Sequence, residues 1–244
     1  MPSSRFDLHL HEQLLLLALK DRKGTVDYRA GQYHLAMGGA ILAELALDGW
    51  IRVDPGKRAQ VQPVDRTDRI GDEIMDEALS RIRESSRRRW GSTWVTKFGS
   101  LKRLRHRTAR GLCRRGILRA TESDLLLIFS RKAYPTLDPG PERDLVNRMR
   151  SAIMSDGEVE PRLGVVLSLA HTTGSLRIHF GRKELRSRKA RRKDITSGKA
   201  YGSLTHPALA TQRAVKSSVE AAQAAVVAAN AAVVTAVAAS SASS

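Results

Sequence analysis

Cysteine and aromatic residues are scarce in this 244-residue chain. Cys113 is its only cysteine, which excludes a disulfide within the chain and any zinc or iron–sulfur site built from several thiolates. Aromatic side chains make up 5% of the residues, so few rings are available to stack on single-stranded bases. The chain also lacks a run of 18 strongly apolar residues and the basic-then-apolar start of a signal peptide. We therefore expect a soluble intracellular protein.

Sequence motifs for catalysis are missing as well. The chain contains no GxxxxGK(S/T) phosphate loop, no HExxH, no GxSxG and no DxDxDG loop. His9 and His11 are two residues apart, which on a helix points the rings to different faces and argues against a metal site. His171, after an apolar run, is interpreted as a helix-end histidine, and Cys113, next to Leu112, as a core thiol. The sequence thus predicts a non-enzymatic protein without a metal or a cofactor.

Positive charge is what the chain has in excess. It carries 42 Lys and Arg residues against 25 Asp and Glu residues, a formal net charge of +17. Residues 81–115 hold 13 basic and 1 acidic side chains, and residues 182–216 hold 11 basic and 2 acidic ones. Charge gathered in two blocks indicates a surface for an anionic partner rather than general solubility. Nucleic acid and the anionic face of a membrane both fit this description.

The spacing of apolar residues predicts a mainly α fold. Buried helices are expected over residues 8–20, 33–47 and 162–170, the last of them central to the core. Other elements are expected along the chain, namely helices over 72–83, 101–115, 142–154 and the Ala-rich residues 218–239, and a short strand over 50–53. Residues 55–69 are interpreted as a polar connection and residues 84–100 as an irregular segment. The Gly38-Gly39 pair predicts close packing of two helices.

A β-hairpin is predicted where residues 117–120 precede a dense apolar run. That run comprises Leu125, Leu126, Leu127, Ile128 and Phe129. Five consecutive apolar residues are more than one strand face buries, so the outward members predict self-association through the hairpin. The Ala-rich helix is the alternative cover for the same surface. The expected architecture is a compact helical domain with a central buried helix and a β-hairpin over residues 1–216, followed by an Ala-rich helix and Ser-rich tail over 217–244.

The basic segment 101–115 is the candidate anion site. Lys102 and Arg105 are three residues apart, so on a helix they project side by side and can grip one phosphorylated headgroup. A second group is expected to contact a membrane at headgroup depth and consists of Arg87, Arg88, Arg89, Trp90 and Trp94. The plainer alternative is a solvated basic face on a core helix, which does not explain why acidic residues are nearly absent from residues 81–115.

Five segments in the same order resemble the Golgi phosphoprotein 3 family, in its shorter prokaryotic form. They are Leu14 to Gly24 (LLLLALKDRKG), Gly39 to Gly49 (GAILAELALDG), Asp72 to Leu79 (DEIMDEAL), Leu101 to Leu118 (LKRLRHRTARGLCRRGIL) and Leu167 to Phe180 (LSLAHTTGSLRIHF). The resemblance implies a mostly helical domain with an oligomerising β-hairpin at about residues 117–135. It also implies a peripheral membrane protein, since eukaryotic members bind phosphatidylinositol 4-phosphate and help to retain glycosyltransferases in the Golgi.

The resemblance further implies where a headgroup pocket lies. The family's pair of basic residues falls on Lys102 and Arg105, and its tryptophan falls near Tyr28 and Arg29. The family's arginine in the second helix falls on Gly38 and is lost, although Arg29 is available to replace part of that charge. The implied headgroup site is therefore Lys102, Arg105, Arg29 and Tyr28. Without this arginine, specificity for the 4-phosphate is less expected, whereas binding to anionic lipid remains expected.

Taken together, the residues and the resemblance predict a non-catalytic adaptor on the cytoplasmic face of a membrane. Its expected partners are an anionic phospholipid membrane, a second copy of the chain through the hairpin, and membrane-protein clients. The rival function is a nucleic-acid-binding protein that lays the 101–115 helix along phosphates. That function lacks a recognisable RNP, KH or zinc-finger pattern in the sequence, so nucleic acid is the less favoured partner.

Overall fold

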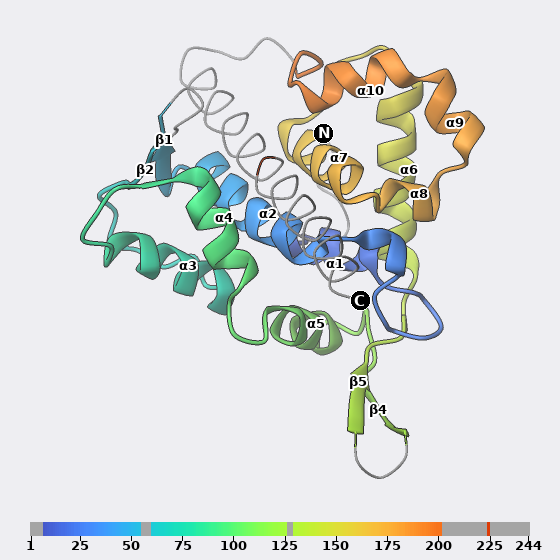
Figure 1. The fold of residues 1–244 in the computed structure, drawn as a ribbon, viewed down its shortest axis with the longest axis horizontal. Coiled ribbons are helices and arrows are strands. Elements are labelled where there is room, and N and C mark those ends of the chain that lie inside the picture. Colours follow the sequence, from blue (N-terminus) through green and yellow to red (C-terminus); the bar gives the residue numbers. More distant parts are fainter. Residues whose placement is uncertain (1–6, 55–59, 126–128, 202–223, 225–244) are drawn as a thin grey trace, which may run out of the picture.

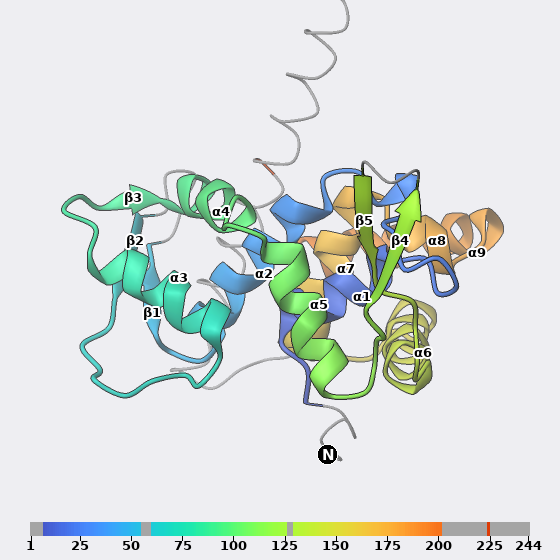
Figure 2. The ribbon, with the colours of Figure 1, turned by 90° about the horizontal axis from the view of Figure 1, so that it is seen from below.

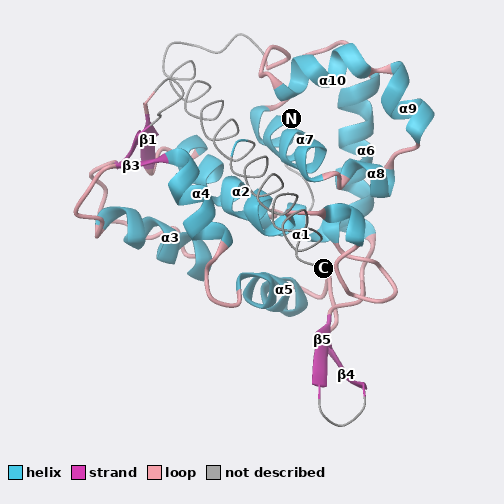
Figure 3. Cartoon of the chain, in the orientation of Figure 1, coloured by secondary structure: helices cyan, strands magenta, loops and turns pink. Residues whose placement is uncertain are grey.

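The computed structural model describes residues 7–54, 60–125, 129–201 and 224, and helices dominate this part of the chain (Figure 3). The helices are α1 (Leu10–Ala18), the 3-10 helix η1 (Tyr28–Ala30), α2 (Tyr33–Leu47), α3 (Glu73–Arg83), α4 (Gly91–Gly99), α5 (Leu104–Arg114), α6 (Gly140–Met154), α7 (Pro161–Thr173), α8 (Leu176–His179), α9 (Arg182–Ser187) and α10 (Lys189–Thr196). The strands are β1 (Ile51–Val53), β2 (Gln60–Pro63), β3 (Arg89–Trp90), β4 (Thr121–Leu125) and β5 (Phe129–Ala133). The predicted mainly α class is confirmed.

Helix α2 runs through the middle of the molecule and packs against α1, α4 and α7 (Figure 1). Every residue from Leu35 to Ala46 is buried, and all of them except Glu44 are nonpolar. A helix without a polar face has to be surrounded by other elements. The predicted buried helix at 162–170 is likewise confirmed by α7, whose residues from Leu163 to Ala170 are buried. The core is thus built where the sequence placed its longest apolar helices.

The contact between α2 and α4 is unusually close, and glycine makes it possible. A Cβ atom built on Gly38 would overlap the carbonyl oxygen of Val95 and lie 2.5 Å from the amide nitrogen of Gly99. A Cβ on Gly99 would lie 2.8 Å from the carbonyl oxygen of His34. These partners are backbone atoms and cannot rotate away. The predicted role of the glycine pair in close helix packing is confirmed at Gly38.

A buried carboxylate joins three segments at the other end of α2. The Glu44 side chain is fully buried; it accepts a hydrogen bond from the backbone amide of Leu10 at 2.9 Å and contacts the His9 ring nitrogen Nδ1 at 3.2 Å. Arg162 of α7 completes the group with an ion pair to the same carboxylate. Because a buried charge requires partners, these contacts fix the start of α1 and of α7 against α2.

Two sequence interpretations were wrong in the region before α5. Residues 55–69 are more than a polar connection, since they contain β2, which pairs antiparallel with β1 and with β3. Residues 84–100 are not irregular, since they contain β3 and the helix α4. Three large side chains of α4 face the core, those of Trp94, Val95 and Phe98, so the apolar periodicity of this helix is short. A strand with one buried residue, Val61, and a nine-residue helix are too short to give a clear periodic signal.

The predicted hairpin is present but its strands lie elsewhere. β4 and β5 pair antiparallel with Thr121 opposite Ala133 and Leu125 opposite Phe129. The expectation that residues 117–120 form the first strand and that the apolar run forms the second was therefore wrong. The run instead straddles the connection: Leu125 ends β4, Phe129 begins β5, and Leu126, Leu127 and Ile128 lie outside the described residues. In Figure 1 the hairpin projects from the helical body beside α5.

The second basic block forms the short helices α9 and α10, which lie across one end of α6 and α7 (Figure 1). Two of its arginines satisfy carbonyl groups at the end of α6. Arg188 donates to the carbonyl oxygen of Ile153 at 2.9 Å, and Arg191 donates to that of Ala152 at 3.2 Å. These two cations are held in place as helix caps. The predicted domain boundary at 216/217 and the Ala-rich helix, apart from Ala224, lie outside the described residues.

Candidate anion-binding site

The start of α5 differs from the sequence prediction in a way that matters for the site. The helix begins at Leu104 rather than at residue 101, so Lys102 lies in the turn before it. Arg103 precedes the first helical residue with a left-handed backbone, φ 55° and ψ 30°. Such a conformation is uncommon for a residue with a side chain. Lys102 and Arg105 therefore do not share one helical turn, and the geometric argument that paired them is corrected.

A surface cavity of about 300 Å³ lies between the start of α2 and the turn that leads into α5. Its polar lining consists of Tyr33, His34, Arg103, Arg105 and His106. Met37, Gly99, Leu101 and Leu104 form the apolar part of the wall. Among the residues that the structure describes, no carboxylate lines the cavity. Two guanidinium groups and two imidazoles around one small volume favour an anion as its occupant.

Both imidazoles of this cavity are biased towards the neutral form. Burial lowers the pKa of His34 and of His106, and the cations Arg105, Lys132 and Arg103 lower the pKa of His106 further. His106 is also fixed by a hydrogen bond of 2.9 Å between its Nδ1 atom and the hydroxyl of Tyr134. An anion in the cavity would offset both the burial and the repulsion, because it favours the charged form of each ring.

The cavity is tied to the hairpin by two hydrogen bonds. Arg105 donates from Nη2 to the carbonyl oxygen of Lys132 in β5 at 3.3 Å. Tyr134, directly after β5, is buried and holds the ring of His106. The position of the hairpin strand therefore sets the orientation of two cavity residues that come from α5. In both Figure 1 and Figure 2 the hairpin lies next to α5, as these contacts require.

Tyr28 and Arg29, the other predicted headgroup residues, do not line this cavity. Arg29 forms an ion pair of 3.0 Å with Asp27 and donates to the carbonyl oxygen of Arg177 at 3.3 Å. This guanidinium holds the pKa of Asp27 down at about 2. Tyr28 is 83% exposed, with the Lys20 and Arg29 cations near its ring. The structure thus brings Arg105 together with residues that were not predicted, and leaves Tyr28 and Arg29 in a separate group beside α8.

The fold leaves no room for a side chain at Gly38, the position that matches the family's arginine. Gly38 faces the backbone of α4 at Val95 and Gly99, so even a methyl group has no room there. The arginine is therefore excluded by the approach of α4, and Arg29 does not take its place. His34 lies one helical turn before Gly38 on α2 and supplies the polar group at the cavity instead. No sequence signal pointed to His34, because a lone histidine on an apolar helix is usually a core residue.

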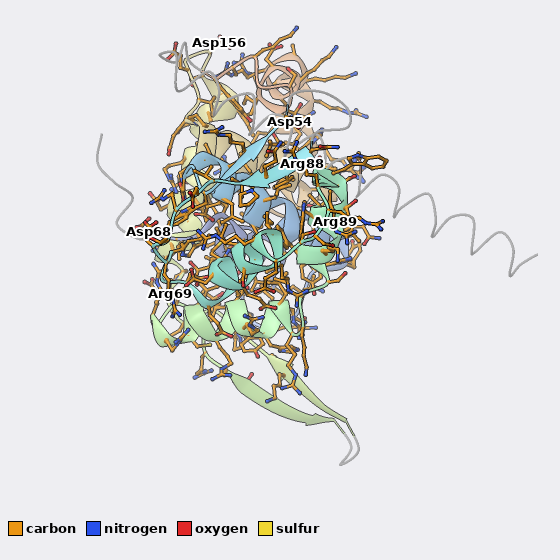
Figure 4. All side chains as sticks on the ribbon, turned by 90° about the vertical axis from the view of Figure 1, so that its left-hand side faces the viewer. Asp54, Asp68, Arg69, Arg88, Arg89 and Asp156 are labelled. Atoms are coloured by element: carbon orange, nitrogen blue, oxygen red, sulfur yellow. The ribbon has the colours of Figure 1, made fainter. Side chains whose placement is uncertain are left out.

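The predicted membrane-contact residues divide between surface and core. Arg87 and Arg88 are exposed, Arg89 is half-buried and Trp90 is 47% exposed. Trp94 is 2% exposed and stacks on Phe98, so its predicted contact with lipid headgroups is corrected: it is a core residue of α4. Figure 2 shows β3, α4 and the hairpin strands along one edge of the molecule. In Figure 4 Arg89 lies towards one side of the molecule, whereas Asp68 and Arg69 lie on the opposite side.

Part of the charge on α5 has a structural role that the sequence did not reveal. Arg107 pairs with Glu73 at 3.0 Å and with Glu77, both on α3. Arg115 pairs with Glu12 of α1 at 3.2 Å. These acids are remote in sequence, which is why residues 81–115 seemed uncompensated. The cations of this segment that remain for an external anion include Lys102, Arg103 and Arg105 at the start of α5.

A second cavity of about 320 Å³ lies between the α1–α2 connection, α6 and α8. Asp21, Glu142 and His179 line it together with Arg143 and Arg150. Burial and the nearby Asp21 carboxylate raise the pKa of Glu142 to about 8. His179 contacts Glu142 at 3.6 Å and the carbonyl oxygen of Leu17 at 2.9 Å. Mixed charge makes this cavity a poorer match for a polyanion than the one between α2 and α5.

In the part of the chain that the structure describes, no helix has both the length and the apolar character needed to cross a bilayer.

Comparison with known proteins identifies the same family that the five sequence segments resemble. A model of the Golgi phosphoprotein 3 (GPP34) family matches residues 10–237. Two relatives carry the name vacuolar protein sorting-associated protein 74. The relative from Eremothecium gossypii is 31% identical over 164 residues, and that from Schizosaccharomyces pombe is 33% identical over 165. The alignments cover 60% and 61% of this chain and 49% of each relative, so the chain spans about half the length of the curated relatives it matches.

Proposed function

The chain belongs to the Golgi phosphoprotein 3 (GPP34) family, as its sequence segments indicated, and we propose that it is a non-catalytic adaptor that binds phosphorylated lipid headgroups on the cytoplasmic face of a membrane. The headgroup site is the α2–α5 cavity. The proposed ligand is a phosphoinositide such as phosphatidylinositol 4-phosphate. The proposed function also includes binding to membrane-protein clients and self-association through the hairpin.

One observation carries this function: the acid-free cavity between α2 and α5. Arg105, the residue that matches the family's basic pair, meets Arg103 there, and both line a volume of about 300 Å³. A charge-assisted hydrogen bond contributes about 1.5–3 kcal/mol, more than a single exposed Lys–phosphate contact. Two guanidiniums directed at one phosphate thus provide recognition that a dispersed basic surface does not.

Exposed cations outside the cavity add a less specific attraction. Arg87, Arg88 and Lys102 are exposed, and β3 lies on the same edge of the molecule as α4 in Figure 2. Each basic residue near an anionic bilayer contributes about 1 kcal/mol at physiological salt. Trp90, 47% exposed at the start of α4, is the aromatic residue placed to settle at headgroup depth. Together these groups would orient the cavity towards the membrane.

Vesicle co-sedimentation tests the proposal. Wild-type protein is mixed with neutral vesicles and with vesicles that contain phosphatidylinositol 4-phosphate. The charge reversal Arg105→Glu is the test variant, and Arg69→Glu is its matched control, because Arg69 is exposed on the side of the molecule opposite to Arg89 (Figure 4). We expect phosphoinositide-dependent pelleting that Arg105→Glu weakens about tenfold, the equivalent of one lost charge-assisted hydrogen bond.

Equal, negligible pelleting with neutral and phosphoinositide vesicles at low salt would reject membrane binding. Equal losses in Arg105→Glu and Arg69→Glu would show that only net charge matters and would remove the role of the cavity. A gel shift with random duplex DNA at the same salt concentration tests the rival function. Duplex binding without vesicle binding would favour a nucleic-acid partner for the basic surface, with the steep salt dependence of counterion release.

A further inference from the structure

We propose that binding of a phosphate monoester in the α2–α5 cavity is linked to proton uptake by His34 and His106, so that the protein holds its ligand more tightly as the pH falls. This inference rests on the proposed function and adds ligand-binding residues to it. It also assigns a positioning role to Tyr134, which holds His106. The chemistry is shared by a phosphoinositide headgroup and by free phosphate, and the experiment below separates the two.

The first support is the composition of the cavity wall. His34 enters from α2, Arg103 from the turn before α5, and Arg105 and His106 from the first turn of α5. A phosphate monoester carries close to two negative charges at neutral pH, whereas the phosphodiester of an ordinary phospholipid carries one. Four nitrogen-bearing side chains around about 300 Å³, with no carboxylate among the described lining residues, match the doubly charged group better.

The second support is the hydrogen bond that positions the His106 ring. Its Nδ1 atom is 2.9 Å from the Tyr134 hydroxyl, and the two rings are 5.7 Å apart. In the neutral tautomer that carries its hydrogen on Nε2, Nδ1 accepts a hydrogen bond from the tyrosine hydroxyl. When the imidazole is protonated, the tyrosine oxygen accepts instead, and Nε2 still carries a hydrogen. In that tautomer and in the charged form alike, His106 is therefore a donor at Nε2, and it gains a charge in the second.

The third support is the electrostatic surroundings of the two rings. His106 faces Arg103 and Arg105 from its own segment and Lys132 from β5, and these cations together with burial lower its pKa. Burial alone lowers the pKa of His34, whose ring meets Tyr33 edge-on at 5.9 Å. Within the described residues, no hydrogen bond satisfies the ring nitrogens of His34. Both histidines are thus mostly neutral in the empty cavity at neutral pH.

An anion bound between these groups opposes the lowering of the histidine pKa values that burial and the cations cause. It favours the charged form of each ring, so the pKa of each histidine is higher in the complex than in the free protein. By linkage, the affinity then rises as the pH falls, by at most about tenfold per pH unit for each proton taken up. Below about pH 6 the ligand itself becomes protonated, because the second pKa of a phosphate monoester is about 6. The useful window therefore lies between about pH 6.5 and 8.

Vesicle binding across this window provides the first measurement. Vesicles with phosphatidylinositol 4-phosphate are compared with vesicles of matched surface charge made with phosphatidylserine, at pH 6.5 and 8. We expect the dissociation constant for the phosphoinositide vesicles to fall by about fivefold or more from pH 8 to pH 6.5, within the limit set by one or two linked protons. Phosphatidylserine vesicles should show a smaller change, since a phosphodiester carries a single negative charge.

Three variants separate the histidines from general charge. The double substitution His34→Gln with His106→Gln should flatten the pH dependence. Tyr134→Phe keeps the ring packing but removes the hydroxyl that holds His106, so it should reduce the pH dependence more than the affinity at pH 8. His171→Gln is the matched control, because His171 is exposed at the end of α7 and does not line the cavity. It should retain the wild-type pH profile.

Proton NMR titration of the imidazoles, with inorganic phosphate and then with phosphoinositide vesicles, distinguishes the two ligand sources. A rise in the pKa of His34 and His106 with both supports the inference. A rise with inorganic phosphate but no vesicle binding keeps the inference and rejects the membrane function. Vesicle binding that is phosphoinositide-dependent yet identical at pH 6.5 and 8 overturns the inference and leaves the proposed function standing. Unchanged histidine pKa values with both ligands also overturn it.

Discussion

Gly38→Ala offers a direct test of the α2–α4 contact. Alanine is the best helix former, so in an unconstrained helix interior this change stabilises by about 1 kcal/mol. In this protein the added methyl group would overlap the carbonyl oxygen of Val95 and lie 2.5 Å from the amide nitrogen and 3.1 Å from the Cα atom of Gly99. All three atoms belong to the backbone of α4, which has to move as a unit to make room.

The magnitude follows from two opposing terms. Overpacking of a well-filled core costs typically 1–3 kcal/mol and occasionally more. A clash with the backbone of α4 lies at the upper end of that range, because no side chain can change rotamer to relieve it. After the gain in helix propensity is subtracted, we expect Gly38→Ala to lower the free energy of unfolding by about 2 kcal/mol.

Urea denaturation followed by circular dichroism provides the assay, and Gly111→Ala provides the matched control. Gly111 is also inside a helix, α5, but a Cβ there would lie 3.5 Å from Glu12 Oε1 and 4.0 Å from Arg114 Nη2. These are ordinary contacts with side chains. Gly111→Ala should therefore stabilise by up to about 1 kcal/mol, so the two variants should differ by about 3 kcal/mol at an unchanged slope against urea.

A Gly38→Ala variant as stable as Gly111→Ala would refute the reasoning. It would mean that α4 does not approach α2 at Val95 and Gly99 as described. The same geometry predicts that Gly38→Arg, which restores the family's arginine, displaces α4 and loses stability instead of gaining headgroup affinity. Tighter vesicle binding by a folded Gly38→Arg protein would contradict the account of why the arginine is absent.

Three further predictions concern the buried ionic groups and the hairpin. Arg162→Met leaves the fully buried Glu44 without its guanidinium partner and should cost about 3–5 kcal/mol in urea denaturation; a loss under 1 kcal/mol would show that the ion pair is dispensable. Burial lowers the pKa of His11 from 6.5 to about 4, so its contribution is present above pH 6.5 and lost as the pH falls towards 4. His11→Leu should therefore flatten the decline of the melting temperature over that interval, and an unchanged decline would exclude His11 as its cause. Leu126→Asp, or Leu127→Asp, should lower both the oligomer mass in light scattering and the vesicle-bound fraction; a protein monomeric at tens of micromolar that binds vesicles undiminished would break this link.

Sequence patterns located the long elements well and the short ones poorly. α2 begins and ends at the residues that periodicity indicated, because fifteen residues carry enough apolar positions to define a helix. β2 and α4 were missed, since their signals rest on one and three core residues. The hairpin was found, but its strands were misplaced because the apolar run from Leu125 to Phe129 was interpreted as a single strand. Cross-strand pairing is a tertiary property that a consecutive run does not encode.

The candidate site likewise combines a residue that a local sequence pattern indicated with residues that only the fold brings together. Arg105 was found, because it lies in a run of basic residues and matches the family's basic pair. Arg103, His34 and His106 were missed, since the cavity exists only where the start of α2 meets the turn before α5. Trp94 was assigned to the membrane because its neighbours are basic, yet it is buried and stacks on Phe98. A position next to charged residues in sequence does not determine which way a side chain on a helix points.

By itself, the sequence determined the helical class, the two basic blocks, the close approach of a helix at Gly38 and the family. The first three follow from composition or from spacing within about fifteen residues, and the family follows from the order of five short segments. Only the tertiary structure decided which cations remain for a ligand. Arg115 is paired with Glu12, which lies 103 residues away in the sequence. Arg107 is paired with Glu73 and Glu77. Electrostatic pairing depends on distance in space, and folding brings those acids to α5, whereas the described residues that line the cavity at its start include no carboxylate.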